Sequence, residues 1–290
     1  MKKIFILSIG ALFCLAGCSD DPVGSPKKSA ASLSVEKVQR AFVGYVGASW
    51  CPPCGSAGGP GFKLIRDEYS TDEVVGMYFA PSGVTVAYVE GGSPAPYVNQ
   101  YMSSVMKSDG SIPFFSINGI NVGGAYTEPS YTLDKYSVNI NEMLAKAPEL
   151  GIAASQTLTD GKLTCNVALE AYSDYSDPLY YSVMAVEKKA IGFQKVGGTD
   201  EANYEHSYIM RASLIGDGTM SGQELFQAVT SGGVSTGDRF DETFSLDFEK
   251  IESSKVIEWN YTPSNTVLVA TLWAKDADGK YVYVNSVMAK

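Results

Sequence analysis

The sequence predicts an α/β domain followed by an all-β sandwich domain. Within residues 35–148, apolar runs rich in β-favouring residues alternate with stretches of helical spacing, which is the pattern of an α/β domain. From about Gly151 onward the chain contains only short apolar runs, and turn signals separate them at the spacing typical of a β-sandwich. The pattern changes where Pro148 follows the last helical stretch. We therefore expect domains over 35–148 and 149–290.

The first 34 residues are expected to lie outside both domains. Lys2 and Lys3 precede an apolar run that is too short to span a bilayer, and Leu-Ala-Gly-Cys over residues 15–18 resembles a bacterial lipobox. The expectation is a signal peptide over 1–17, cleavage before Cys18, and fatty acyl chains such as palmitate on that cysteine. An ordinary secretory signal is the alternative. Residues 18–34 are rich in Ser, Pro, Asp and Lys and are expected to form a flexible tether.

The composition excludes two broad classes of partner. The chain has 290 residues and a net charge of −10, so it lacks the basic surface that nucleic-acid binding requires. After the signal, no apolar stretch is long enough to span a membrane, so membrane contact is expected only through Cys18. The five cysteines include one close pair, which does not make a disulfide-stapled scaffold.

The elements of the first domain are centred on Ser-Trp-Cys-Pro-Pro-Cys-Gly at residues 49–55. The run Ala41 to Val46 predicts a buried strand that leads directly into this segment. A helix is expected over 55–69, but four glycines and Pro60 crowd its first two turns, so it should start late, kink or begin with an irregular turn. The remaining expected elements are a strand over Val74–Phe79, a helix over Tyr97–Lys107, a strand and Asn-Gly turn over 111–119, and a helix over Tyr131–Lys146.

The second domain is expected to contain eight strands. Asp-Gly, Gly-Gly and Asp-Pro pairs mark the turns between them. A short helix or a loop is expected over Ser221–Val229, which has little β character. The predicted strands are Ile152–Leu158, Leu163–Ala171, Tyr180–Glu187, Ser207–Leu214, Phe240–Phe248, Val256–Trp259, Val267–Ala274 and Tyr281–Met288.

Cys51 and Cys54 are the candidate chemical site. A thiolate at a helix N-terminus is stabilised by the free N–H groups and the dipole there, which can lower a cysteine pKa from about 8.5 to about 3.5–7.5. Such a pair is reversibly oxidisable at neutral pH. A zinc site needs four ligands, and only Cys165 and His206 remain, both in the other domain, so no metal is expected. Cys165 is expected to be a buried small hydrophobe, and His206 a structural histidine under a sandwich loop.

Two motifs make residues 35–147 resemble the thioredoxin fold. Trp50-Cys51-Pro52-Pro53-Cys54 is similar to the motif of periplasmic reductases related to cytochrome c maturation. The segment Ile112-Pro113-Phe114-Phe115, followed by Asn118-Gly119, resembles the cis-proline strand of that family. The resemblance implies that Pro113 is cis and lies across from the dithiol, which leaves the backbone before it free to pair with an extended substrate.

Over its whole length the chain resembles the Omp-twenty-eight-related family of Bacteroidota outer-membrane lipoproteins. Their architecture joins a thioredoxin-like part to an immunoglobulin-like part, and the segment from Tyr204 to Arg211 is similar to a histidine-containing strand of that family.

The thioredoxin resemblance also implies roles for the dithiol residues. Cys51 would be the exposed attacking thiolate, Cys54 would resolve the mixed disulfide, and the two would form a disulfide when oxidised. Trp50 would flank the site, and Pro52 and Pro53 would stiffen the turn. Two positions depart from thioredoxins: Tyr45 replaces a buried acid, and Pro60 lies one residue later than the usual helix proline.

The expected function is that of a lipid-anchored outer-membrane thiol–disulfide oxidoreductase that needs no cofactor. Its partner would be another exported protein with thiols or a disulfide, met on the periplasmic or the cell-surface side. The alternative is a non-catalytic lipoprotein that binds a protein or a glycan and whose Cys51–Cys54 bridge is structural.

Overall fold

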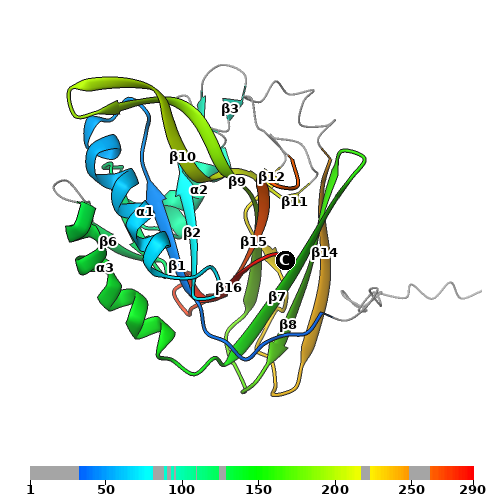
Figure 1. Cartoon of the computed structure of the whole chain (residues 1–290). Coiled ribbons are helices and arrows are strands. Elements are labelled where there is room, and N and C mark those ends of the chain that lie inside the picture. Colours follow the sequence, from blue (N-terminus) through cyan, green and yellow to red (C-terminus); the bar gives the residue numbers. More distant parts are fainter. Residues whose placement is uncertain are drawn as a thin grey trace, which may run out of the picture.

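The computed structural model describes residues 33–80, 88–89, 93–94, 96–108, 110–123, 129–216, 223–247 and 262–290, and it is mostly β-sheet with few helices (Figure 1). The predicted signal peptide, Cys18, nearly all of the tether, and the predicted strand Val256–Trp259 lie outside the described residues. In the described part of the chain, no helix is long and apolar enough to cross a membrane.

One large sheet runs through the centre of the molecule, in the order β16-β15-β9-β10-β2-β1-β5-β6. β1 pairs parallel with β2 and antiparallel with β5, and Asn118 and Gly119, both at positive φ, form the turn from β5 to β6. The bounds are β1 Ala41–Val46, β2 Val74–Phe79, β5 Phe114–Ile117, β6 Ile120–Gly123, β9 Leu179–Val196, β10 Thr199–Ser213, β15 Thr266–Lys275 and β16 Tyr281–Met288.

The helices cover both faces of the N-terminal half of this sheet. α1 (Gly59–Glu68), preceded by the π-helical turn η1 (Cys54–Gly58), packs with α3 (Pro129–Leu144) on one face. Tyr45, Phe62, Ile65, Phe115 and Tyr136 form the core there. α2 (Pro96–Ser104) packs on the opposite face.

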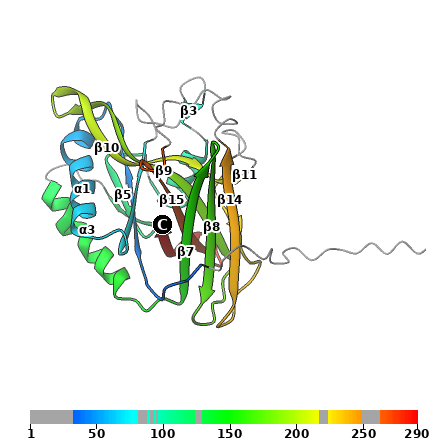
Figure 2. The ribbon, with the colours of Figure 1, turned by 45° about the vertical axis from the view of Figure 1, so that its right-hand side comes forward.

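A second sheet, in the order β14-β8-β7, packs against the C-terminal half of the large sheet (Figure 2). Its strands are β7 (Leu150–Thr159), β8 (Lys162–Ala171) and β14 (Arg239–Asp247). Tyr181 of β9 meets Phe244 of β14 edge-to-face, with ring centroids 5.9 Å apart, so the two layers share one apolar interior.

The short strands are β3 (Tyr88–Val89), β4 (Ser93–Pro94), β11 (Ile215–Gly216), β12 (Gln223–Glu224) and β13 (Gln227–Ala228). The helix alternative for Ser221–Val229 is therefore wrong over its described part, because β13 pairs with Tyr180 and Tyr181 of β9.

The large sheet connects the two predicted domains. Ile209 of β10 pairs parallel with Tyr78 of β2, so strands from either side of residue 148 lie in one sheet. Trp273 of β15 contacts Phe42 of β1 and Tyr101 of α2 edge-to-face, with centroids 6.0 Å away in both cases. The division at residue 148 stays a prediction, and the two parts share both a sheet and a core.

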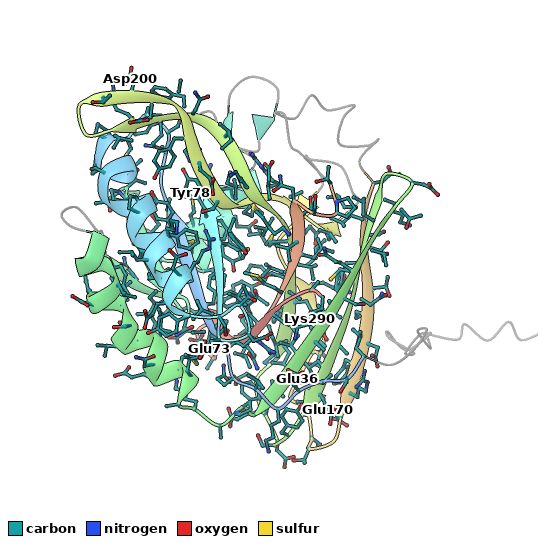
Figure 3. The ribbon with its side chains drawn as sticks, viewed as in Figure 1. Glu36, Glu73, Tyr78, Glu170, Asp200 and Lys290 are labelled. Carbon is teal, nitrogen blue, oxygen red and sulfur yellow. A yellow bond between two sulfur atoms is a disulfide. The ribbon has the colours of Figure 1, made fainter. Side chains whose placement is uncertain are left out.

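β9 and β10 extend well beyond their predicted bounds, Tyr180–Glu187 and Ser207–Leu214. Their outer halves form a hairpin over residues 188–207, called the arm below, which leaves the sheet and bends over α1. Asp200 lies at its end (Figure 3). Tyr208, at φ 55°, lies where β10 passes from the arm into the sheet. The apolar pattern did not predict the arm because half of its residues are solvent-exposed and polar residues interrupt the apolar ones.

Candidate functional site

Cys51 and Cys54 form a disulfide at the start of the helix that follows β1. The S–S distance is 2.16 Å and the Cα atoms are 5.3 Å apart. The backbone turns helical at Pro52 and continues through η1 into α1. The Cys54 N–H donates to the Cys51 carbonyl oxygen at 3.1 Å and is also 3.2 Å from Cys51 Sγ, so a donor of the helix start is shared with that sulfur.

The irregular helix start that the glycines predict is confirmed as the π-helical turn η1. Two of the glycines allow close contacts from distant parts of the chain. A Cβ at Gly55 would lie 2.4 Å from the Lys195 carbonyl oxygen of the arm, and one at Gly58 would lie 2.6 Å from Cβ of Pro113. The glycines therefore allow the helix start to fit between the proline segment and the arm.

Pro113 follows a cis peptide bond, as the resemblance implies. Ile112 packs against the buried cluster of Ala48, Cys51 and Cys54, which places the proline segment beside the dithiol. Among the described residues, Ile112 makes no hydrogen bond through its backbone N–H or carbonyl. The resemblance predicts that this backbone pairs with an extended substrate.

Tyr45 occupies the position where thioredoxins have a buried acid. Its hydroxyl donates to the carbonyl oxygen of Cys54 at 3.3 Å. Burial, with smaller contributions from Tyr78 and Tyr204, raises the pKa of Tyr45 well above its usual value. The phenol therefore stays protonated at neutral pH and cannot accept the proton of the Cys54 thiol.

The arm covers the dithiol from the other side. Gln194 donates through Nε2 to the carbonyl oxygens of Ala48 at 3.3 Å and Cys51 at 3.1 Å. The Lys195 N–H donates to the Ser49 carbonyl at 2.7 Å, and the Gly197 N–H to the Pro52 carbonyl at 3.3 Å. No sequence pattern predicted these contacts, because they join residues more than 140 positions apart.

The exposure predicted for Cys51 is wrong. Cys51 and Cys54 are only 3% and 2% exposed, because the arm and Ile112 enclose them. Trp50, by contrast, is 54% exposed and flanks the covered pair. Pro52 and Pro53 lie in the first helical turn, so the helix begins earlier than the expected start at residue 55.

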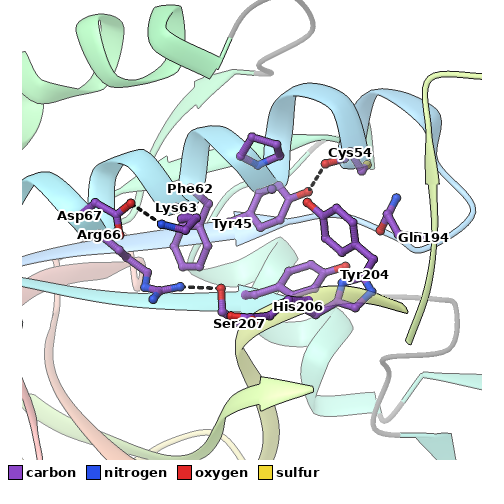
Figure 4. A pocket seen from close by; sticks show the side chains of 14 residues that line it. Tyr45, Cys54, Phe62, Lys63, Arg66, Asp67, Gln194, Tyr204, His206 and Ser207 are labelled. Atoms are coloured by element: carbon purple, nitrogen blue, oxygen red, sulfur yellow. Dashed lines mark hydrogen bonds and ion pairs between the residues drawn. The ribbon is translucent and has the colours of Figure 1, made fainter. Parts of the chain in front are cut away.

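A pocket of about 570 Å³ lies between the arm and α1 (Figure 4). Aromatic side chains form much of its lining, with Tyr45 and Phe62 on one side and Tyr204 on the other. At one end Arg66 donates to the Ser207 hydroxyl, and its guanidinium lies 4.0 Å from the ring centroid of Tyr208.

His206 lies in this pocket and not under a sandwich loop as expected. Its ring is 6.2 Å from that of Tyr78 and 4.9 Å from that of Tyr204, and Nε2 is 3.3 Å from the Phe193 carbonyl oxygen. Burial lowers the pKa of His206 to about 4, so the imidazole is neutral at pH 7. His206 belongs to the arm and packs from it against Tyr78 of β2.

Cys165 is fully buried in β8, and its thiol is free, so the expectation of a small core residue is confirmed. Burial raises its pKa to about 12. Within the described residues, no group of three His, Cys, Asp or Glu side chains is arranged to hold a metal.

Comparisons with known proteins place this fold. No family model matches the sequence, and no curated protein matches it. HBP35 of Porphyromonas gingivalis has a similar structure, with a TM-score of 0.60 and 12% identity over 88% of this chain and 76% of that chain. A β-glucosidase from Kluyveromyces marxianus aligns over 49% of this chain and 14% of its own, with a TM-score of 0.21 and 11% identity, which carries no argument. The chain therefore shares its overall fold with HBP35.

Proposed function

We propose that this chain is a thioredoxin-like thiol–disulfide oxidoreductase that exchanges electrons with other exported proteins. The observation that carries the proposal is the position of the disulfide at a helix start, with Ile112 and cis-Pro113 packed beside it. The connection from β1 through the dithiol helix to the parallel β2, followed by the antiparallel β5–β6 hairpin and α3, matches the predicted thioredoxin-like order.

The exchange would proceed in two balanced steps. The Cys51 thiolate attacks one sulfur of a partner disulfide, which forms a mixed disulfide and releases the other partner sulfur as a thiolate. The Cys54 thiolate then attacks Cys51 Sγ, which closes the Cys51–Cys54 bond and releases the second partner sulfur. Two electrons pass to the partner, and the reverse sequence oxidises it. The proton of Cys54 leaves to water, since Tyr45 is already protonated.

The proposal includes a location and an architecture. Lipidation at Cys18 would hold the protein at the outer membrane, on its periplasmic or cell-surface side. The part after residue 148 would be immunoglobulin-like and would position the dithiol. In support, this part supplies the arm that contacts the dithiol loop.

A non-catalytic lipoprotein with a structural disulfide is the second candidate. The observation that favours it is the burial of both sulfur atoms, at 3% and 2% exposure. A permanent bridge would be protected in this way, whereas an exchanging one must become accessible.

The Cys51→Ser variant of the mature chain separates these candidates. Exchange with a thiol-bearing or disulfide-bearing exported protein is expected to fall to background, because the attacking sulfur is lost. The measurement is the rate of mixed-disulfide formation and of partner reduction. Cys165→Ala is the control, because the Cys165 thiol is fully buried and lies outside the site. This variant should leave both rates unchanged. An unmodified protein whose exchange is already as low as that of Cys51→Ser supports the structural bridge.

A further inference from the structure

We propose that the arm is a gate on the dithiol, and that it occupies the place where the extended segment of a partner protein binds. The inference rests on the proposed function, and it adds what controls access and what kind of partner fits. The partner is a protein that presents an extended segment with a cysteine in it. Such a segment replaces the arm along the dithiol loop.

The arm contacts the dithiol loop in the manner of a bound peptide. Its end donates hydrogen bonds to four carbonyl groups of one short segment, those of Ala48, Ser49, Cys51 and Pro52. Two of the three donor groups, the N–H groups of Lys195 and Gly197, belong to the main chain, and any extended chain can supply such donors. Strand addition of this kind derives its affinity from main-chain hydrogen bonds.

Gln194 is the residue that closes the gate. Its side chain is 2% exposed, and its Nε2 donates to two loop carbonyls and also lies 2.9 Å from the Lys195 carbonyl. Gly55 lets the arm reach this position, since a Cβ there would meet Lys195 and Gln194 at 2.4 and 2.8 Å. The closed arm leaves Cys51 only 3% exposed, so an incoming thiolate cannot reach its sulfur.

The rest of the arm is held weakly enough to open. The pocket of about 570 Å³ lies between α1 and the arm at Gln194 and residues 204–207 (Figure 4). Its two ion pairs, Lys189–Glu205 and Lys195–Asp200, join residues within the arm, and their side chains are largely exposed, so they contribute little. Further contacts of the arm are Tyr204 over Gly59, Ser207 against Arg66 and His206 against Tyr78, and the last two lie near its base. Opening of the end of the arm breaks the hydrogen bonds of Gln194, Lys195 and Gly197 to the dithiol loop and leaves the contacts at its base in place, so few buried contacts need to be broken.

The charges that line the pocket do not favour a ligand of either sign. Lys63 pairs with Asp67 on its rim, and Glu205 pairs with Lys189, so the charges along it are largely balanced. Its position under the arm makes it part of the gate: it is the space into which Tyr204 and its neighbours can move.

The first test uses the unmodified mature protein. The rate of reduction of the Cys51–Cys54 disulfide is measured in native buffer against increasing dithiothreitol, with mass spectrometry of alkylated thiols as the readout. A gate predicts that the rate rises and then levels off at the opening rate of the arm. A rate that stays proportional to dithiothreitol, and that equals the rate for an exposed model disulfide, overturns the proposal.

The second test removes the closing hydrogen bonds. Gln194→Met keeps the size of the side chain and loses its donors, and at low dithiothreitol it is expected to be reduced about tenfold faster, which corresponds to about 1.4 kcal/mol in the opening equilibrium. Gln156→Met is the matched control, because Gln156 in β7 is likewise bonded to backbone groups, Thr266 and Leu268, but belongs to the second sheet. It should be reduced at the unmodified rate.

A second variant covers the case in which Gln194→Met is unstable. Lys195→Pro removes the main-chain donor to Ser49 and leaves Gln194 in place, and it should also accelerate reduction. Unfolding rates measured in parallel separate opening of the arm from global unfolding. If both variants are reduced at the unmodified rate, the arm is not a gate.

These results are independent of the proposed exchange reaction. Reduction by dithiothreitol reports access to the disulfide, and the Cys51→Ser assay with a partner protein reports exchange. A saturating reduction rate, together with partner exchange in the unmodified protein no faster than in Cys51→Ser, would retain the covering arm and reject the oxidoreductase. If exchange requires Cys51 but the reduction rate stays proportional to dithiothreitol, the oxidoreductase is retained and the gate is rejected.

Discussion

Replacing Arg211 with methionine is expected to lower the free energy of unfolding by about 3–5 kcal/mol, the range for breaking a buried ion pair. Arg211 of β10 and Glu187 of β9 have side chains only 3% and 2% exposed. The guanidinium Nε donates to Glu187 Oε2 at 2.7 Å, and Asn265 donates to Oε1 at 3.1 Å. Without Arg211, the carboxylate would remain buried without its counter-charge.

The measurement is equilibrium unfolding in urea by fluorescence. Lys189→Met is the control, because Lys189 also pairs with a glutamate across the same two strands but is 56% exposed, so its loss should cost less than about 1 kcal/mol. The double variant Arg211→Met/Glu187→Leu should regain much of the lost stability, since no charge then remains buried. Equal losses for Arg211→Met and Lys189→Met would contradict the assignment.

The features predicted correctly from the sequence are those with a local cause. The Asn118-Gly119 turn follows from residues that tolerate positive φ, and both residues have it. The strand before Cys51 and the irregular helix start after Cys54 follow from β-propensity and from the cost of glycine in a helix. The cis bond at Pro113 was implied by a motif of a few residues. Each of these needs only its neighbours in sequence.

The features that the sequence did not predict depend on distant residues. Glycine at position 55 is unfavourable for a helix, but it allows the Lys195 carbonyl to approach closely. No residue near position 55 indicates that contact. The outer halves of β9 and β10 pair with each other and with the dithiol loop, and not with an apolar core, so hydrophobic periodicity could not reveal them. The burial of Cys51 follows from the same arm, which is why the resemblance alone predicted the wrong exposure.

His206 should make the stability of the protein depend on pH between about 6.5 and 4. Burial is the main cause that lowers its pKa from 6.5 to about 4, and the positive charge of Arg211 adds to it, while the contact with the Phe193 carbonyl opposes it. In this range the unfolded chain binds a proton that the folded chain excludes. The contribution is therefore fully present above pH 6.5 and is lost as the pH falls to about 4, and its size is about 3 kcal/mol.

The His206→Gln variant tests this dependence, because glutamine retains a donor for the Phe193 carbonyl and does not titrate. The free energy of unfolding of both proteins is measured in urea from pH 7 to pH 4. Carboxylates titrate in both, so the difference between the two curves isolates the histidine. We expect the curves to converge toward acid pH by about 3 kcal/mol relative to their separation at pH 7. Parallel curves would mean that His206 accepts a proton in the folded protein as readily as in the unfolded chain, which is incompatible with an imidazole buried between Tyr78 and Tyr204.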